Sequence, residues 1–244
     1  MSRTAVYSAL VLRSRPSGES NNEVYLLTAE EGIIRATVFG GPKSKLRSHS
    51  APYNSGKVWI YRDKSKDYAK LSDFDVQSWR AGLRELYERV MSAATLAEAI
   101  LLSHGGGGDW GEALRLAAAT LDALEDANEE LCGRLIVHFL WRWAAFLGIQ
   151  PNIDVCAVCG KKAGDENGGA VWYSAGEGHT LCAACAHDQA GLLQISAGSR
   201  RWLSAVSALE PSELYRFSMD NKSFNEAKSL AAAVLAAALG KKLI

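Results

Sequence analysis

Four of the five cysteines stand in two pairs whose spacing is suited to a metal ion. The pairs lie in "CAVC" and "CAAC", and 22 residues separate them. A Cys-x-x-Cys pair brings two thiolates to one ion, and tetrahedral Zn²⁺ in structural sites takes four such ligands. The alternative is a set of unligated or redox-active thiols. We predict one Zn²⁺, bound by Cys156, Cys159, Cys182 and Cys185.

The predicted metal ion is structural rather than catalytic. A shell of four sulfurs leaves no position for water, so the ion cannot generate a hydroxide. The H-x-E pattern of zinc deaminases is missing. The first pair follows "PNID" in a loop, whereas a thioredoxin-like pair opens a helix. His179 and His187 flank the second pair and are expected at the surface, and Cys132 is expected to be a buried small apolar side chain.

Other motifs that carry chemistry are not found in the sequence. "GGPKSK" at 40–45 departs from the order of a phosphate-binding loop, and neither G-x-S-x-G nor H-E-x-x-H occurs. None of the five histidines pairs with carboxylates at a catalytic spacing. We therefore expect a protein that is not an enzyme.

The stretch "GGPKSKLRSHSAPYNSGKVW" combines cations with aromatic residues. Cations that reach phosphates, beside aromatics that stack on bases, are what a small barrel needs to bind single-stranded nucleic acid. We expect Trp59 inside the barrel and Tyr53 outside it. The alternative is a solvated loop followed by core aromatics. The candidate DNA contacts are Arg35, Lys43, Lys45, Arg47 and Tyr53.

The elements that carry these residues change character near residue 80. The first 80 residues contain five strand-like segments, separated by turns: "TAVYSALVLRSR", "EVYLLT", "IIRATVFG", "GKVWIYR" and "YAKLSDFDV". No long helical pattern interrupts them, which argues against parallel βαβ units and favours an OB-type barrel, or an SH3-like alternative. The segment "AVYSALVL" is apolar on both faces, as expected for a barrel wall that also packs on a neighbouring domain.

Helical periodicity follows from Leu83 onward. The first predicted helix buries residues at three- and four-residue steps: Leu83, Leu86, Tyr87, Val90, Ala94, Ala97 and Leu101. "GGGG" at 105–108 ends it, and Asp109 with Glu112 resembles a capping box for the next helix. A third helix covers "ELCGRLIVHFLWRWAAFLG", and two more cover "SRRWLSAVSAL" and "NEAKSLAAAVLAAALG".

These segments define a multi-domain α+β protein. Its parts are a five-stranded OB-type barrel at 1–80 and an all-α domain at 81–150 and 190–244, with a zinc-ribbon-like, four-cysteine insertion at 151–189. Residues 1–80 carry 13 Lys and Arg and 8 Asp and Glu, whereas residues 81–150 carry 5 and 10. Such asymmetry indicates separate partners. We expect no signal peptide and no membrane span, and the paired cysteines favour the reducing cytoplasm.

The order of these parts resembles the RecO family of bacterial recombination mediators. The similarity lies in the opening "AVYSALVLRSRPSGESNNEVYLLTAEEGIIRATVFGGPKSKLR", with its first-turn "GE", its "LLT" strand and its basic "KSK" loop. It continues in "FLGIQPNIDVCAVCG" and "LCAAC". The stretches "GESNNEVY" and "SHSAPYNSG" depart from the family pattern, where an acidic residue and a more apolar segment are usual.

The resemblance implies a non-catalytic DNA-binding function. It implies an OB fold that binds single- and double-stranded DNA and anneals complementary strands. It also implies loading of RecA, together with RecR, onto DNA coated by single-strand binding protein, whose acidic C-terminal tail is received by the helical domain. Candidate contacts for that tail are Arg115, Arg134 and Arg142, which are otherwise surface charges on a packed helix. The alternative function is a zinc-ribbon and OB-fold factor of RNA metabolism or transcription.

Overall fold

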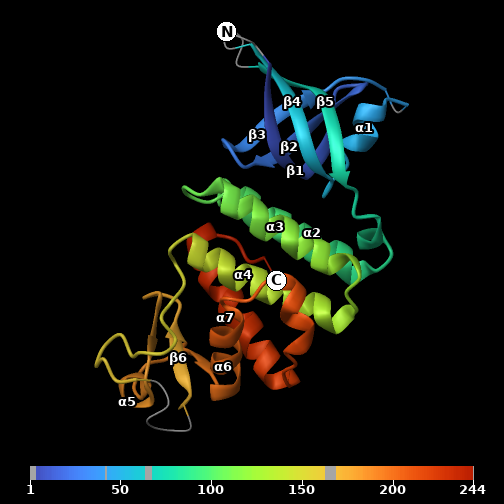
Figure 1. Cartoon of the computed structure of the whole chain (residues 1–244). Helices are drawn as coiled ribbons and strands as arrows, with labels where there is room; N and C mark the ends of the chain where they lie inside the picture. Colours follow the sequence, from blue (N-terminus) through green and yellow to red (C-terminus); the bar gives the residue numbers. More distant parts are fainter. Residues whose placement is uncertain (1–3, 42, 64–67, 163–168, 244) are drawn as a thin grey trace. The chain divides into compact units, whose positions relative to one another are not determined.

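The computed structural model describes residues 4–41, 43–63, 68–162 and 169–243. Its first part is a closed five-stranded barrel with strand order β1-β2-β3-β5-β4 (Figure 1). The strands are β1 (Thr4–Ser17), β2 (Asn21–Thr28), β3 (Gly32–Val38), β4 (Ser55–Asp63) and β5 (Tyr68–Ser78). β1 is long enough to pair with β4 through its first half and β2 through its second, and β3 meets β5 in parallel to close the wall. The predicted OB-type barrel is confirmed.

The alternation of side chains along the strands fills the barrel. Val58 and Ile60 of β4 join a buried cluster with Val24, Leu26 and Phe74. Trp59 lies between Val58 and Ile60, so the pleat turns its side chain outward, opposite Val6 and Asp73 on the neighbouring strands. The prediction that Trp59 lies inside the barrel is therefore wrong.

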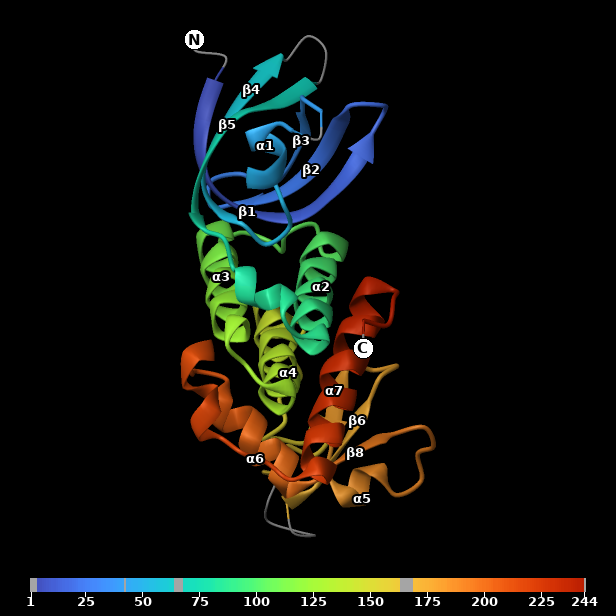
Figure 2. The ribbon, with the colours of Figure 1, turned by 90° about the vertical axis from the view of Figure 1, so that its right-hand side faces the viewer.

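The segment between β3 and β4 is more ordered than its composition indicates. Residues 43–54 were expected to form a loop, but they contain a short helix, α1 (Lys45–His49), which packs at the barrel (Figure 2). Leu46 lies against the barrel core. A single apolar residue in a polar stretch gives no helical period, so the sequence could not reveal this helix.

Two helices complete the first compact unit, which spans Met1–Ala127. The predicted helix from Leu83 is divided into a 3₁₀ turn, η1 (Ala81–Arg84), and α2 (Tyr87–Leu102). Tyr87 is 71% exposed, and the buried face of α2 instead carries Ala93, Leu96 and Ile100. The predicted apolar stripe is therefore correct for Leu83 and Ala97, which are buried, but wrong for Tyr87 and Val90, which are exposed. α3 (Trp110–Glu125) begins at Asp109, whose side chain accepts a hydrogen bond from the Glu112 backbone, as the capping pattern predicts.

Both α2 and α3 pack against the barrel wall. They contact β1, and α3 also contacts β2. Leu10, Leu12 and Leu27 are buried but lie outside the barrel's own core cluster. Trp110 covers the β2–β3 turn, where a Cβ added to Gly32 would lie 2.8 Å from the Trp110 ring. β1 is therefore apolar on both faces because one face fills the barrel and the other packs against helices, as predicted.

The second compact unit spans Asn128–Ile244 and is mainly helical. Its helices are α4 (Glu129–Phe146), α6 (Ala197–Val206), the 3₁₀ turn η3 (Pro211–Arg216) and α7 (Asn221–Leu239). α4 contacts all three of the others, and its buried residues include Cys132, Phe139 and Trp143. Among the described residues, no helix is long and apolar enough to cross a membrane.

Candidate metal centre and nucleic-acid interface

A three-stranded sheet of order β7-β6-β8 accompanies the cysteine pairs. Its strands are β6 (Val171–Ser174), β7 (His179–Leu181) and β8 (Leu193–Ile195), and the short helix α5 (Ala183–Ala186) follows β7. Leu181 and Ala186 form a small buried cluster with Cys156, and Trp172 and Leu192 pack against it. Cys156, Cys182 and Cys185 therefore lie on a local core, whereas Cys159 is exposed in a turn.

The four predicted ligands converge. The sulfur atoms of Cys156, Cys159, Cys182 and Cys185 all lie within 4.8 Å of one another. The Sγ atoms of Cys159 and Cys182 are 3.7 Å apart. A tetrahedral ion with metal–sulfur bonds of about 2.3 Å spaces its ligands by about 3.8 Å, so the donor set fits a metal ion. It is the one such cluster of His, Cys, Asp and Glu in the described part of the chain.

The backbone around the first pair favours a thiolate. Burial opposes ionisation of Cys156, but backbone N–H groups of Cys159, Cys182 and Val158 donate to its sulfur and lower its pKa to about 6. In contrast, hydrogen bonding with the Cys182, Cys159 and Cys156 sulfurs raises the pKa of Cys185 to about 12. Four crowded thiols cannot all ionise without a cation among them, which is the condition that a bound metal meets.

His187 and Cys132 behave as expected, whereas His179 is less exposed than expected. The His187 side chain is 82% exposed and bonds the neighbouring Asp188. His179 is half-buried on β7. Cys132 is buried in α4, far in sequence from the four ligands. Gly160 follows the first pair with φ of +71°, a left-handed conformation that glycine adopts without strain, and its N–H donates to the Cys156 carbonyl.

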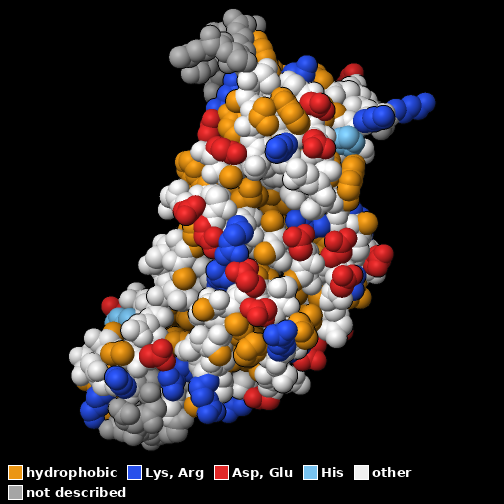
Figure 3. Space-filling model, in the orientation of Figure 1, with side chains coloured by type: hydrophobic (Ala, Val, Ile, Leu, Met, Phe, Trp, Pro, Cys, Tyr) orange, Lys and Arg blue, Asp and Glu red, His pale blue; other side chains and the backbone are white. Residues whose placement is uncertain are grey.

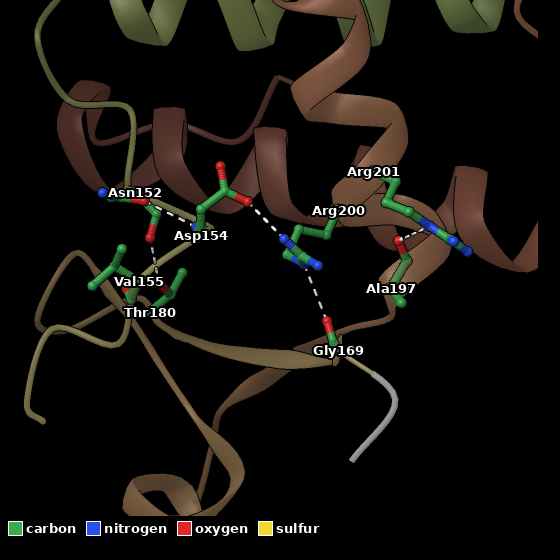
Figure 4. Close-up of polar contacts among 8 residues, drawn as sticks. All are labelled: Asn152, Asp154, Val155, Gly169, Thr180, Ala197, Arg200 and Arg201. Carbon is green, nitrogen blue, oxygen red and sulfur yellow. Dashed lines mark hydrogen bonds and ion pairs between the residues drawn. The ribbon is translucent and has the colours of Figure 1, made fainter. Parts of the chain in front are cut away.

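An arginine of α6 ties this cysteine-bearing segment to the helices. The Arg200 guanidinium lies 2.6 Å from the Asp154 carboxylate and donates to the Gly169 carbonyl at 3.1 Å (Figure 4). Its neighbour Arg201 turns back to the carbonyl of Ala197. One side chain thus holds both the entry to the metal segment and the start of its sheet.

The predicted cations of the first unit lie on or next to α1. Lys43 and Lys45 are exposed, Arg47 is half-buried, and Lys and Arg side chains project at this corner of the barrel (Figure 3). Within the described ranges, no carboxylate forms an ion pair with any of the three. This corner therefore offers positive charge that none of the described carboxylates neutralises.

The arginines on the barrel wall are different because they are paired. Arg35 lies 3.3 Å from Glu23, and Arg62 lies 2.7 Å from Glu31. Both line a groove of about 440 Å³ that also includes Tyr68. Sequence reasoning included Arg35 but missed Arg62 and Tyr68, since a strand pattern does not reveal which exposed positions share a groove. An anion in this groove would have to compete with the protein's own glutamates.

The remaining candidate binding residues all interact with other groups of the protein. Tyr53 is half-buried, burial raises its pKa, and its carbonyl accepts a 2.7 Å hydrogen bond from Arg80. Arg115 pairs with Glu112 on α3, at 2.7 Å. In the second unit, Arg134 and Arg142 donate to the backbone carbonyls of Phe217 and Leu209, respectively. Arg115 belongs to the first compact unit, whereas Arg134 and Arg142 belong to the second.

Comparison with known proteins covers nearly the whole chain. The family model "Recombination protein O N terminal" matches residues 1–79, and "Recombination protein O C terminal" matches residues 84–243. A curated DNA repair protein RecO from Anaeromyxobacter dehalogenans is 32% identical over 200 residues, 80% of this chain and 76% of the relative. The one from Desulforamulus reducens is 23% identical over 96% of this chain and 90% of its own length. The chain belongs to the RecO family of DNA repair proteins.

Proposed function

We propose that this chain is a non-catalytic recombination mediator. It binds single- and double-stranded DNA, anneals complementary strands and, with RecR, helps to load RecA onto DNA coated by single-strand binding protein. In this proposal residues 1–80 are the DNA-binding domain. Residues 81–150 and 190–244 form the partner-binding domain, which carries the metal insertion at 151–189. Family membership supports the proposal, and the observation that carries it is the unneutralised positive charge at α1.

The DNA path runs over α1 and its preceding turn. Lys43, Lys45 and Arg47 contact phosphates, and Arg35 and Tyr53 are further candidate contacts. Each neutralised phosphate of a single strand lowers the slope of log affinity against log salt by about 0.7, so three contacts contribute about 2. Because phosphates carry no base information, affinity depends little on sequence.

The salt dependence of binding to single-stranded DNA tests this path. Replacing Lys43, Lys45 and Arg47 together by alanine flattens the slope by about 2. The matched control replaces the exposed Lys222 and Lys228 of α7, which keeps the slope. A triple variant that folds but retains the wild-type slope removes α1 from the DNA path.

Annealing of complementary strands coated with single-strand binding protein tests the mediator role. The wild-type chain accelerates this annealing, and the triple variant does so less. The same assay with RNA strands separates the proposal from a role in RNA metabolism, because a mediator favours DNA. Faster annealing of RNA than of DNA contradicts the proposal.

The metal is one structural Zn²⁺ per chain, held by Cys156, Cys159, Cys182 and Cys185. The spacing of the sulfurs and the thiolate-favouring environment of Cys156 support it. When bound, the ion clamps the two pairs together and stabilises the segment around them. A closed four-sulfur shell supplies no nucleophile, in keeping with a non-catalytic function.

The acidic tail of single-strand binding protein binds the helical domain. A cleft of about 180 Å³ between α4 and α7 is lined by Arg134, Met219 and Phe224, and also by Glu129 and Glu130. Glu130 lies 3.7 Å from Arg134. The Nε atom of Arg134 is buried and has no hydrogen-bond partner in the described part of the chain. A cation beside apolar side chains suits a tail that combines acidic and apolar residues, and in this proposal a tail carboxylate displaces Glu130 from Arg134. Arg115 and Arg142 are further candidates for the same interaction.

Calorimetry with a synthetic tail peptide at low salt tests this interaction. The peptide binds the wild-type chain, and Arg134→Met weakens it. Arg115→Met and Arg142→Met show in the same way whether either arginine contributes. A peptide that releases no heat and causes no shift of the unfolding temperature refutes the site.

A further inference from the structure

Trp79 is a large aromatic side chain that the fold does not bury. It directly follows β5 and is 48% exposed, whereas the inward residues of that strand, Leu71 and Phe74, are buried in the barrel core. Its contact with the protein includes His49, the last residue of α1, whose ring lies 5.3 Å away at 88°. An edge contact of this kind leaves indole surface uncovered. The side chain is therefore available to a ligand.

Hydrogen bonds to neighbouring residues hold His49 in position against Trp79. The Nδ1 atom of His49 lies 2.9 Å from the Phe74 carbonyl, so it donates a hydrogen bond that fixes the imidazole ring. The buried Asn54 side chain donates to the carbonyls of His49 and Ser48, which are among the carbonyls left unpaired at the end of α1. The aromatic pair is thus pre-organised and needs little ordering when a ligand binds.

The unpaired cations of α1 lie next to this aromatic pair. Lys45 precedes His49 by four residues in α1, so the two side chains project from the same face of the helix. Their Cβ atoms are about 5–6 Å apart. A stacked strand advances about 3.4 Å per nucleotide. The Trp79 ring lies 5.3 Å beyond the His49 ring, so Lys45 lies within about three nucleotides of a base that contacts Trp79. The combination of an exposed cation and a half-exposed indole is that of a binding site for single-stranded nucleic acid.

We propose that Trp79 is a stacking platform for a base of single-stranded DNA whose phosphates are held by Lys45 and its neighbours. The inference rests on the proposed DNA-binding function and adds to it a contact that the predicted phosphate ligands do not supply. Stacking on an aromatic ring tolerates every base, so Trp79 strengthens binding without selecting a sequence. A stacked base also orders the strand over α1.

Two strands of equal length test the proposal. One is oligo-dT, and the other carries the same phosphates on abasic sugars. Trp79→Ala weakens binding to oligo-dT by about 5- to 150-fold, the range for loss of one stacked base, and leaves binding to the abasic strand unchanged. Trp79→Phe retains most of the affinity for oligo-dT. The salt slope is the same for all three proteins, because no phosphate contact is removed.

Tyr87→Ala is the matched control, since Tyr87 is another exposed aromatic of the same unit but lies on α2. It leaves affinity for both strands unchanged. An equal loss on both strands in Trp79→Ala overturns the proposal, because it assigns Trp79 to positioning α1 or to binding another partner. No loss on either strand overturns it as well. If the wild-type chain binds neither strand, the proposed DNA-binding function itself fails, which is a distinguishable result.

Discussion

His138 makes the second unit sensitive to acid. The side chain lies on α4, is fully buried, and its Nε2 atom donates to the Val206 carbonyl at 3.1 Å. Burial, followed by the positive charge of Arg142, lowers its pKa from 6.5 to about 4. The folded state therefore holds a neutral imidazole under conditions in which the unfolded chain binds a proton.

The magnitude follows from the two pKa values. Because the folded-state pKa is the lower one, the stabilisation is present above pH 6.5 and is lost as the pH falls from there toward 4. The loss between pH 7 and pH 5 is about 2 kcal/mol, and it approaches about 3 kcal/mol below pH 4. Such a change is a substantial part of the stability of a domain of this size.

Urea unfolding of wild-type chain and His138→Gln at both pH values measures the effect. Glutamine keeps a donor for the Val206 carbonyl but does not titrate. The free energy of unfolding of the wild type falls by about 2 kcal/mol more than that of the variant between pH 7 and pH 5. Acid effects on the thiols and carboxylates are common to both proteins and cancel in this difference. Parallel losses in the two proteins refute the reasoning.

Two further predictions concern the metal segment. Metal analysis of freshly purified protein yields about one zinc per chain. Cys159→Ser lowers the zinc content and the solubility, whereas the control Cys132→Ala keeps the metal. A wild-type chain with far less than one zinc contradicts the prediction. Arg200→Ala removes the bonds to Asp154 and Gly169 and speeds amide exchange in β6 at least several-fold without loss of zinc, while Arg201→Ala leaves exchange unchanged. Equal exchange rates in both arginine variants would count against the tether.

The barrel and the metal centre could be predicted because their signals are local. Strands were recognised from short apolar runs between turns, and the ligands were recognised from the fixed spacing of two Cys-x-x-Cys pairs. Four sulfurs within 4.8 Å of one another confirm the constellation. The α1 helix could not be predicted, because its stability comes from Leu46 on the barrel core and from Asn54 beneath its end, which are tertiary contacts.

The inward or outward direction of aromatic residues was harder to predict than their secondary structure. A shift of one residue along a strand reverses the face, so Trp59 was assigned to the wrong side although its strand was correct. The same difficulty applied to α2, whose small buried residues gave a weaker signal than exposed Tyr87 and Val90. The sequence gives no signal for the role of Trp79, because its partner His49 is 30 positions earlier and only the fold brings them together.

The two-sided burial of β1 limits how far the barrel can be used as a transferable module. Leu10, Leu12 and Leu27 point away from the barrel interior and are covered in a unit that continues through α2 and α3 to residue 127. A fragment cut near residue 80 would expose these three side chains, at a cost of roughly 1.5–3 kcal/mol each. Together they would form an exposed apolar patch that favours aggregation. Grafting or dissecting this barrel therefore requires residues 1–127. In a chimera of two related proteins, the barrel should therefore be exchanged together with α2 and α3.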